Sequence, residues 1–121
     1  MDELVRWLGE QFDRDERISR AATLGPWVQS GIGEYGWTVD FGRAGAGVET
    51  ADTEQGRSDA DFIAAHNPAR VLREIDAKRR MIGRIDSHAT IMGWDEVHGD
   101  LLHLLALPYA DRPGYRAEWK P

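Results

Sequence analysis

The sequence contains no cysteine. Disulfide bonds, a thiolate nucleophile and a zinc site with cysteine ligands are therefore excluded. No apolar run approaches the roughly 20 residues that a membrane-spanning helix needs. The acidic start, Asp2-Glu3, has the wrong charge for a signal peptide. These absences predict a cytoplasmic protein with no membrane partner.

Recognisable catalytic motifs are also scarce. Residues 31–36 match the glycine pattern of dinucleotide sites, but the residues after them read as a strand rather than a helix, which favours a hairpin turn. Residues 40–42, Asp-Phe-Gly, match a kinase tripeptide without the other kinase motifs. The four histidines form no tight cluster of metal ligands. The sequence therefore predicts no catalytic residue, no metal site and no cofactor, which argues against an enzyme.

The length of 121 residues predicts a single domain over 1–121. The net charge of -6 argues against a nucleic-acid partner, because such binding depends on neutralising phosphates. Residues 67–86 reverse this balance with six bases and three acids. Arg73, Arg80 and Arg84 are spaced by seven and four residues and can share one helix stripe, which makes them a candidate interaction surface. Pairing of these bases with neighbouring acids is the simpler interpretation.

Helices are expected wherever apolar residues recur at three- and four-residue steps. Residues 2–22 should form the first helix, because Leu4, Leu8 and Phe12 share a face and Gly25-Pro26 follows as a stop signal. Residues 51–58 are expected to be loop, followed by a short helix from residue 58 or 59 to 65. Asn67-Pro68 should begin a long helix over 68–86. A last helix is expected over 95–107, with these side chains facing inward: Val97, Leu101, Leu104 and Leu105.

A small sheet is expected between the first and second helices. Trp37, Val39 and Phe41 alternate with polar or glycine residues, which is typical of a half-buried strand. Short strands at 27–29 and 48–50 should flank it, with glycine-rich turns between them. The predicted fold class is α+β: an antiparallel sheet of about three strands packed against a long N-terminal, a long central and a C-terminal helix. The aromatic tail after residue 108 should pack back on the body.

Two segments carry a resemblance to known proteins. Residues 22–27, Ala-Thr-Leu-Gly-Pro-Trp, and residues 59–72, Asp-Ala-Asp-Phe-Ile-Ala-Ala-His-Asn-Pro-Ala-Arg-Val-Leu, resemble a pair of signatures in small proteins of phage early regions and prophages. Together with residues 73–80 and the C-terminal stretch, the pattern is similar to an uncharacterised family, a domain of unknown function, of high-GC Gram-positive bacteria and their phages. The resemblance implies a phage or prophage setting and no activity.

The residues of these signatures have a structural interpretation. Gly25 and Pro26 turn the chain out of the first helix, and Trp27 is expected to lie across a seam between helix and sheet. The remaining signature residues should anchor the short helix in the core or start the long one: Phe62, Ile63, Asn67 and Pro68.

Three functional hypotheses follow. The leading one is a non-enzymatic phage or prophage accessory protein that binds an unknown host or phage protein; the five tryptophans could serve as binding hot spots. The first alternative is a nucleic-acid-associated regulator that uses the basic helix 68–86. The second is a small-molecule-binding protein with a pocket near the glycine-rich strands and Trp37. A homodimer that forms through an exposed apolar helix face also stays open.

Overall fold

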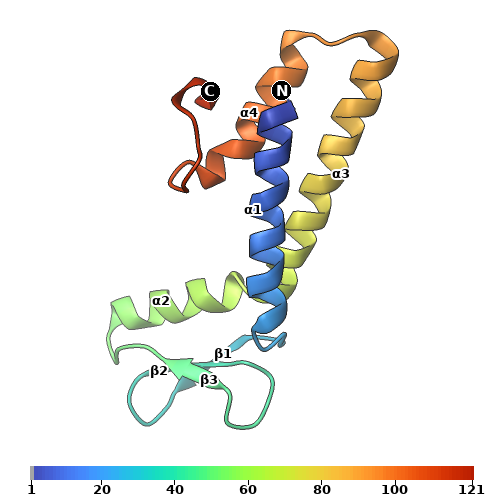
Figure 1. Ribbon diagram of the computed structural model, residues 1–121. Helices are drawn as coiled ribbons and strands as arrows, with labels where there is room; N and C mark the ends of the chain where they lie inside the picture. The colour runs from blue at the N-terminus through green and yellow to red at the C-terminus, as the bar shows by residue number, and fades with distance from the viewer. Residues whose placement is uncertain (1) are drawn as a thin grey trace. The chain divides into compact units, whose positions relative to one another are not determined.

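The computed structural model describes residues 2–121, which form four α-helices, three strands and two 3₁₀ helices in an α+β fold (Figure 1). The order is α1 Asp2–Ala21, β1 Val28–Ile32, β2 Trp37–Asp40, β3 Gly47–Glu49, α2 Glu54–Ala65, α3 Pro68–Met92, α4 Glu96–Ala106, η1 Leu107–Tyr109 and η2 Ala117–Trp119. The chain divides into two compact units. The helical unit comprises the chain up to Asp15 and Ile75–Pro121, and the sheet unit comprises Glu16–Glu74.

The core of the helical unit lies among α1, the C-terminal part of α3, and α4, which run alongside one another in Figure 1. The predicted apolar face of α1 is buried at Leu4, Leu8 and Phe12. The other helices supply four more buried side chains: Ile75, Ile85, Leu102 and Ala106. Each burial of a Leu, Ile or Phe stabilises the fold by about 1.5 to 3 kcal/mol before entropy costs.

The C-terminal tail packs on α1, as its aromatic residues predicted. The indole of Trp7 lies against Tyr109, Tyr115 and Trp119, with ring centroids 6.5, 5.8 and 5.3 Å away. Its Nε1 donates a hydrogen bond to the carbonyl oxygen of Pro113 at 3.1 Å. Tilted and edge-on aromatic contacts of this kind add to burial energy. The tail is therefore part of the helical core.

The sheet unit contains an antiparallel meander in the order β1-β2-β3, with a bulge in β1 between Gln29 and Gly31. Helix α2 covers one face of this sheet. Val39 is buried on that face, and the side-chain amide of Gln29 donates to Asp61 of α2 at 3.0 Å. The predicted meander is confirmed.

Helix α2 begins earlier than the sequence predicted, so the expected loop over 51–58 is wrong from residue 54 onward. Thr53 is the N-cap, and its hydroxyl accepts a hydrogen bond from the Gly56 backbone N–H at 2.9 Å. Gly56 lies in a polar segment, and glycine usually disfavours a helix. It nevertheless lies within α2 and is buried. A Cβ at this position would lie 1.8 Å from the Ala51 carbonyl oxygen, so only glycine fits there.

Phe62 is not a core anchor. Its side chain is 64% exposed and stacks on His66, with centroids 4.0 Å apart. The buried face of α2 is formed instead by Gly56 and Ala60, four residues apart. Phe62 lies two residues from Ala60, about 200° around the helix, so it points away from the sheet. Ile63 is half-buried.

The inward face predicted for α4 is also wrong. Val97, Leu101 and Leu104 are 58%, 43% and 53% exposed, and Leu105 is half-buried. The face that packs inward carries His98, Leu102 and Ala106, which follow one another at four-residue steps. The helix is apolar on two faces, and the one that packs inward carries a histidine beside Leu102, whereas Leu101 and Leu104 stay exposed. Helix α3, in turn, extends to Met92, beyond the predicted end near residue 86.

Candidate protein-docking groove

A surface groove of about 670 Å³ runs between α3 and α4 of the helical unit. Its lining is almost entirely apolar, with two arginines as the charged members: Ala77, Arg80, Met81, Arg84, Ile85, Leu101, Leu104 and Leu105. Residues 77, 81 and 84 lie on one side of α3 because they are spaced by four and three. The α4 side is formed by the leucines that the sequence placed in the core. We call these eight residues the α3–α4 groove.

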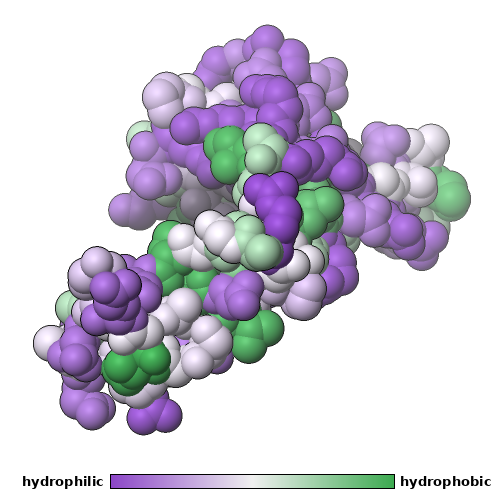
Figure 2. Space-filling view, turned by 90° about the horizontal axis from the view of Figure 1, so that it is seen from below, coloured by the Kyte–Doolittle hydropathy of each residue, from purple (hydrophilic) through white to green (hydrophobic). Residues whose placement is uncertain are grey.

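The groove exposes large apolar side chains that a monomer usually buries. Figure 2 shows apolar residues reaching one face of the molecule as separate patches among hydrophilic ones. In the α3–α4 groove, Met81, Leu101 and Leu104 are 51%, 43% and 53% exposed and belong to one continuous lining. Contiguous apolar surface that is rimmed by polar residues marks interaction sites more often than scattered apolar residues do.

The charged rim of the groove is only partly neutralised. Arg80 Nε lies 3.1 Å from Asp76 Oδ2, but both side chains are well exposed, so this pair contributes little. Arg84 has no ion pair with any described residue. Of the predicted stripe, Arg80 and Arg84 therefore line the groove, whereas Arg73 belongs to the sheet unit and is exposed there.

Two histidines meet close to the start of α4. His98 is 4% exposed, and its Nε2 lies 2.9 Å from His88 Nδ1 on α3. The backbone N–H of Asp95 donates to His98 Nδ1 at 3.0 Å, which completes a capping box. Among residues 2–121 no three His, Asp or Glu side chains are grouped to hold a metal ion. The pair has a structural role, since it ties the helix start to α3.

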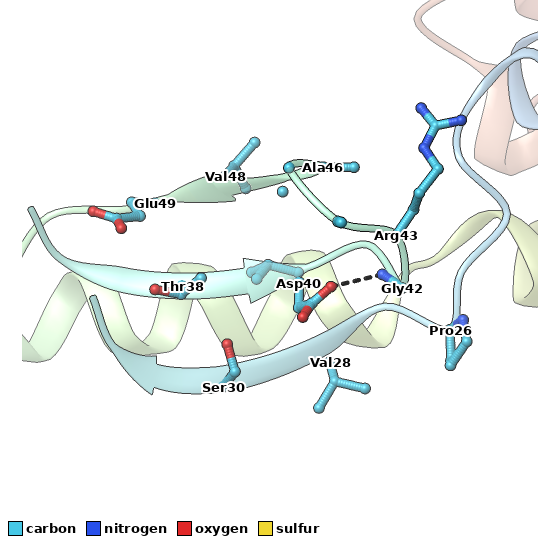
Figure 3. Close-up of a pocket in the computed structure, with 14 residues that line it drawn as sticks. Pro26, Val28, Ser30, Thr38, Asp40, Gly42, Arg43, Ala46, Val48 and Glu49 are labelled. Atoms are coloured by element: carbon cyan, nitrogen blue, oxygen red, sulfur yellow. Dashed lines mark hydrogen bonds between the residues drawn. The ribbon is translucent and has the colours of Figure 1, made fainter. Parts of the chain in front are cut away.

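A second, shallower hollow of about 730 Å³ lies on the sheet face turned away from α2 (Figure 3). Its two carboxylates already accept hydrogen bonds from backbone N–H groups in the turns of the sheet. Asp40 Oδ1 accepts from the Gly42 N–H at 2.7 Å, and Glu49 Oε2 accepts from the Tyr35 N–H at 2.7 Å. Trp37 lies on the opposite face, where the Arg57 guanidinium sits 5.1 Å from its ring centroid.

The two motifs that resemble nucleotide-enzyme sequences are turns. The Gly33 N–H donates to the Gly36 carbonyl at 2.7 Å, so residues 31–36 form the predicted hairpin between β1 and β2. Gly42 has a φ of +85°, which favours glycine, and a Cβ there would lie 2.7 Å from the Gly25 carbonyl carbon. Residues 40–42 thus bring the sheet against the Gly25-Pro26 segment.

The remaining signature residues also act in the framework of the fold. Trp27 stacks on Phe41 at 4.0 Å and its Nε1 donates to the Thr23 carbonyl at 2.6 Å. Asn67 is an N-cap as predicted: its Oδ1 accepts from the Arg70 N–H at 2.9 Å, and Pro68 begins α3.

A family model described as a family of unknown function, DUF6221, matches residues 1–121. The chain belongs to this family. The DUF6221 match covers the entire sequence, including the α3–α4 groove and the signature segments. A search of curated proteins and a search of solved structures found no match. Within the part of this DUF6221 chain that the structure describes, no helix has both the length and the apolar character to cross a membrane.

Proposed function

We propose that this protein is a non-enzymatic accessory protein that acts by binding another polypeptide in the α3–α4 groove. The observation that carries the proposal is the apolar lining of the groove, which joins three exposed large side chains to a rim of two arginines. Apolar grooves between two helices accept the apolar face of a third helix. The described residues offer no cluster of metal ligands that would favour a different role for the helical unit.

The groove defines the chemistry of its occupant. Residues 77 to 85 span eight steps of α3, roughly 12 Å, which matches about two turns of a docked helix. The floor requires apolar side chains at three- and four-residue spacing. Arg80 and Arg84 on the rim favour acidic side chains beside that apolar stripe, because complementary charge selects the partner and its orientation. The occupant is therefore an acidic amphipathic helix.

The setting of this function comes from the sequence. The resemblance of residues 22–27 and 59–72 to small phage proteins supports a phage or prophage origin. The absence of cysteine supports a cytoplasmic location.

Two matched peptides test the proposal. Each is a helix of about 18 residues with leucines at positions i, i+3, i+4 and i+7; one carries glutamates beside the leucines and the other carries lysines. Fluorescence anisotropy should show the glutamate peptide binding about tenfold more tightly. Arg84→Glu should reverse that preference, and Leu104→Asp should abolish binding of both. Equal affinities for both peptides in all three proteins would refute the proposal.

The nucleic-acid alternative has weaker support from the geometry. The basic stretch of α3 is partly neutralised, since Arg79 lies 2.8 Å from Asp13 and Arg80 lies 3.1 Å from Asp76. The small-molecule alternative near Trp37 meets a similar objection, because the carboxylates of the sheet hollow accept hydrogen bonds from the backbone of the sheet itself.

A further inference from the structure

We infer that the helix bound in the α3–α4 groove is α4 of a second copy of this chain, so that two copies form a symmetric dimer. This inference rests on the proposed function of the groove and names the partner. In the dimer, α4 of each copy lies along α3 of the other copy. The four helices, α3 and α4 of each copy, then pack around a shared apolar layer.

Helix α4 has the chemistry that the groove selects. Val97, Leu101 and Leu104 follow one another at steps of four and three residues and are all at least 43% exposed. Asp100 lies on the same side, three residues after Val97 and four before Leu104. The exposed face of α4 is therefore an apolar stripe beside an acid, the pattern that Arg80 and Arg84 favour.

The charges in one copy lack partners that a second copy supplies. Arg84 on α3 and Asp100 on α4 each have no ion pair with a described residue. They have opposite signs and border the same apolar surface. A symmetric interface places the same surface of both copies face to face, so it requires that surface to be self-complementary. An apolar centre with one cation and one anion at its borders meets this requirement.

The two charges also lie close to each other in height along the helix pair. Ile85 lines the α3–α4 groove together with Leu101, and it lines a neighbouring cavity together with Leu102. Arg84 and Leu101 line the same groove, and Asp100 is the residue before Leu101, so the two charged residues lie within about one helical turn, roughly 5 Å, of each other in height. A twofold axis along the helices keeps heights unchanged and exchanges α3 for α4. Asp100 of one copy then faces Arg84 of the other, and the pair occurs twice.

A charge-exchange experiment tests this arrangement. The chain has a mass of 13.6 kDa, and light scattering after size exclusion should show the wild-type protein at twice that mass. Arg84→Glu places glutamate against Asp100, and Asp100→Arg places arginine against Arg84. Each variant alone should therefore raise the dissociation constant of the dimer by about tenfold or more. Mixing the two variants in equal amounts should restore the dimer, because one native Arg84–Asp100 pair forms and the two substituted positions form a second pair with reversed polarity.

The outcomes separate this inference from the proposed function. Circular dichroism spectra of both exposed-site variants should match wild type, and a loss of dimer with an unchanged helical spectrum supports the interface. A wild-type protein that stays at the monomer mass up to millimolar concentration overturns the dimer. Variants that stay dimeric alone, or that fail to associate when mixed, also overturn it. If the glutamate peptide still binds in any of these cases, the proposed docking function stands without the second copy.

Discussion

The imidazoles of His88 and His98 share one hydrogen bond, with 2.9 Å between His88 Nδ1 and His98 Nε2. The second ring nitrogen of His98, Nδ1, lies 3.0 Å from the backbone nitrogen of Asp95, which is a donor. With the Asp95 N–H as donor, His98 Nδ1 accepts and His98 Nε2 donates to His88; Asp95 Oδ1, 3.1 Å from His98 Nδ1, is the competing acceptor. The Nε2 proton of His98 points at His88 Nδ1, so His88 in turn carries its proton on Nε2. One backbone N–H thus sets the tautomers of two histidines.

The first prediction follows from this chain of donors. In its uncharged form each ring should be the Nε2–H tautomer, because the Asp95 N–H donates to His98 Nδ1 and His98 Nε2 then donates to His88 Nδ1. Long-range ¹H–¹⁵N correlation spectra report the tautomer of each ring directly. His103 takes part in neither of these two hydrogen bonds, so its ring provides the reference signal. A spectrum with Nδ1–H at His98 would contradict the donor assignment.

The second prediction concerns two glycines inside helices. Gly56→Ala should destabilise the sheet unit by about 2 to 3 kcal/mol, because the new Cβ would lie 1.8 Å from the Ala51 carbonyl oxygen. Gly83→Ala in α3 should instead stabilise by about 0.5 to 1 kcal/mol, because nothing lies within 4 Å of the Cβ position and alanine favours helix. Thermal melts followed by circular dichroism should shift in opposite directions. A common sign for both variants would rule out this account of the glycines.

The third prediction compares a partly buried ion pair with an exposed one. Arg112 Nη2 lies 2.8 Å from Asp15 Oδ1, with the two side chains 23% and 19% exposed, and Nη1 donates to Gln11 Oε1 at 3.3 Å. Arg112→Ala should cost about 2 kcal/mol, because it leaves partly buried acceptors without a donor.

The matched control for Arg112 is Arg6. Its guanidinium lies 3.9 Å from Glu10 with side chains 70% and 60% exposed, so Arg6→Ala should change stability by less than about 0.5 kcal/mol. Urea unfolding followed by tryptophan fluorescence measures both values. Similar losses in the two variants would show that burial is not what distinguishes the pairs.

Local signals in the sequence predicted the elements well. The apolar steps in 2–22 and the Asn67-Pro68 cap give the observed α1 and the observed start of α3, because helix faces and caps depend on residues within four positions of one another. The alternation around Val39 predicted β2 for the same reason. The start of α2 was missed because Gly56 is a breaker by propensity, and only its contact with Ala51 makes glycine suitable there.

The candidate site required tertiary information. Arg80 and Arg84 were identified from their spacing on one helix, whereas the leucines that complete the groove were expected in the core. Helix α4 offers two apolar faces, and periodicity alone ranks the leucine face first. Packing chose the other face, because His98 finds two hydrogen-bond partners inside and so can be buried without an unpaired polar group.

The sequence by itself therefore determined the fold class, the helix and strand order and the absence of cysteine chemistry, since these follow from composition and from neighbours along the chain. Only the tertiary structure decided which face of α4 stays exposed and which bases join it in a groove. Those outcomes depend on contacts between residues far apart in sequence, such as Trp7 with Trp119, and on hydrogen bonds that make a buried histidine as acceptable as a leucine.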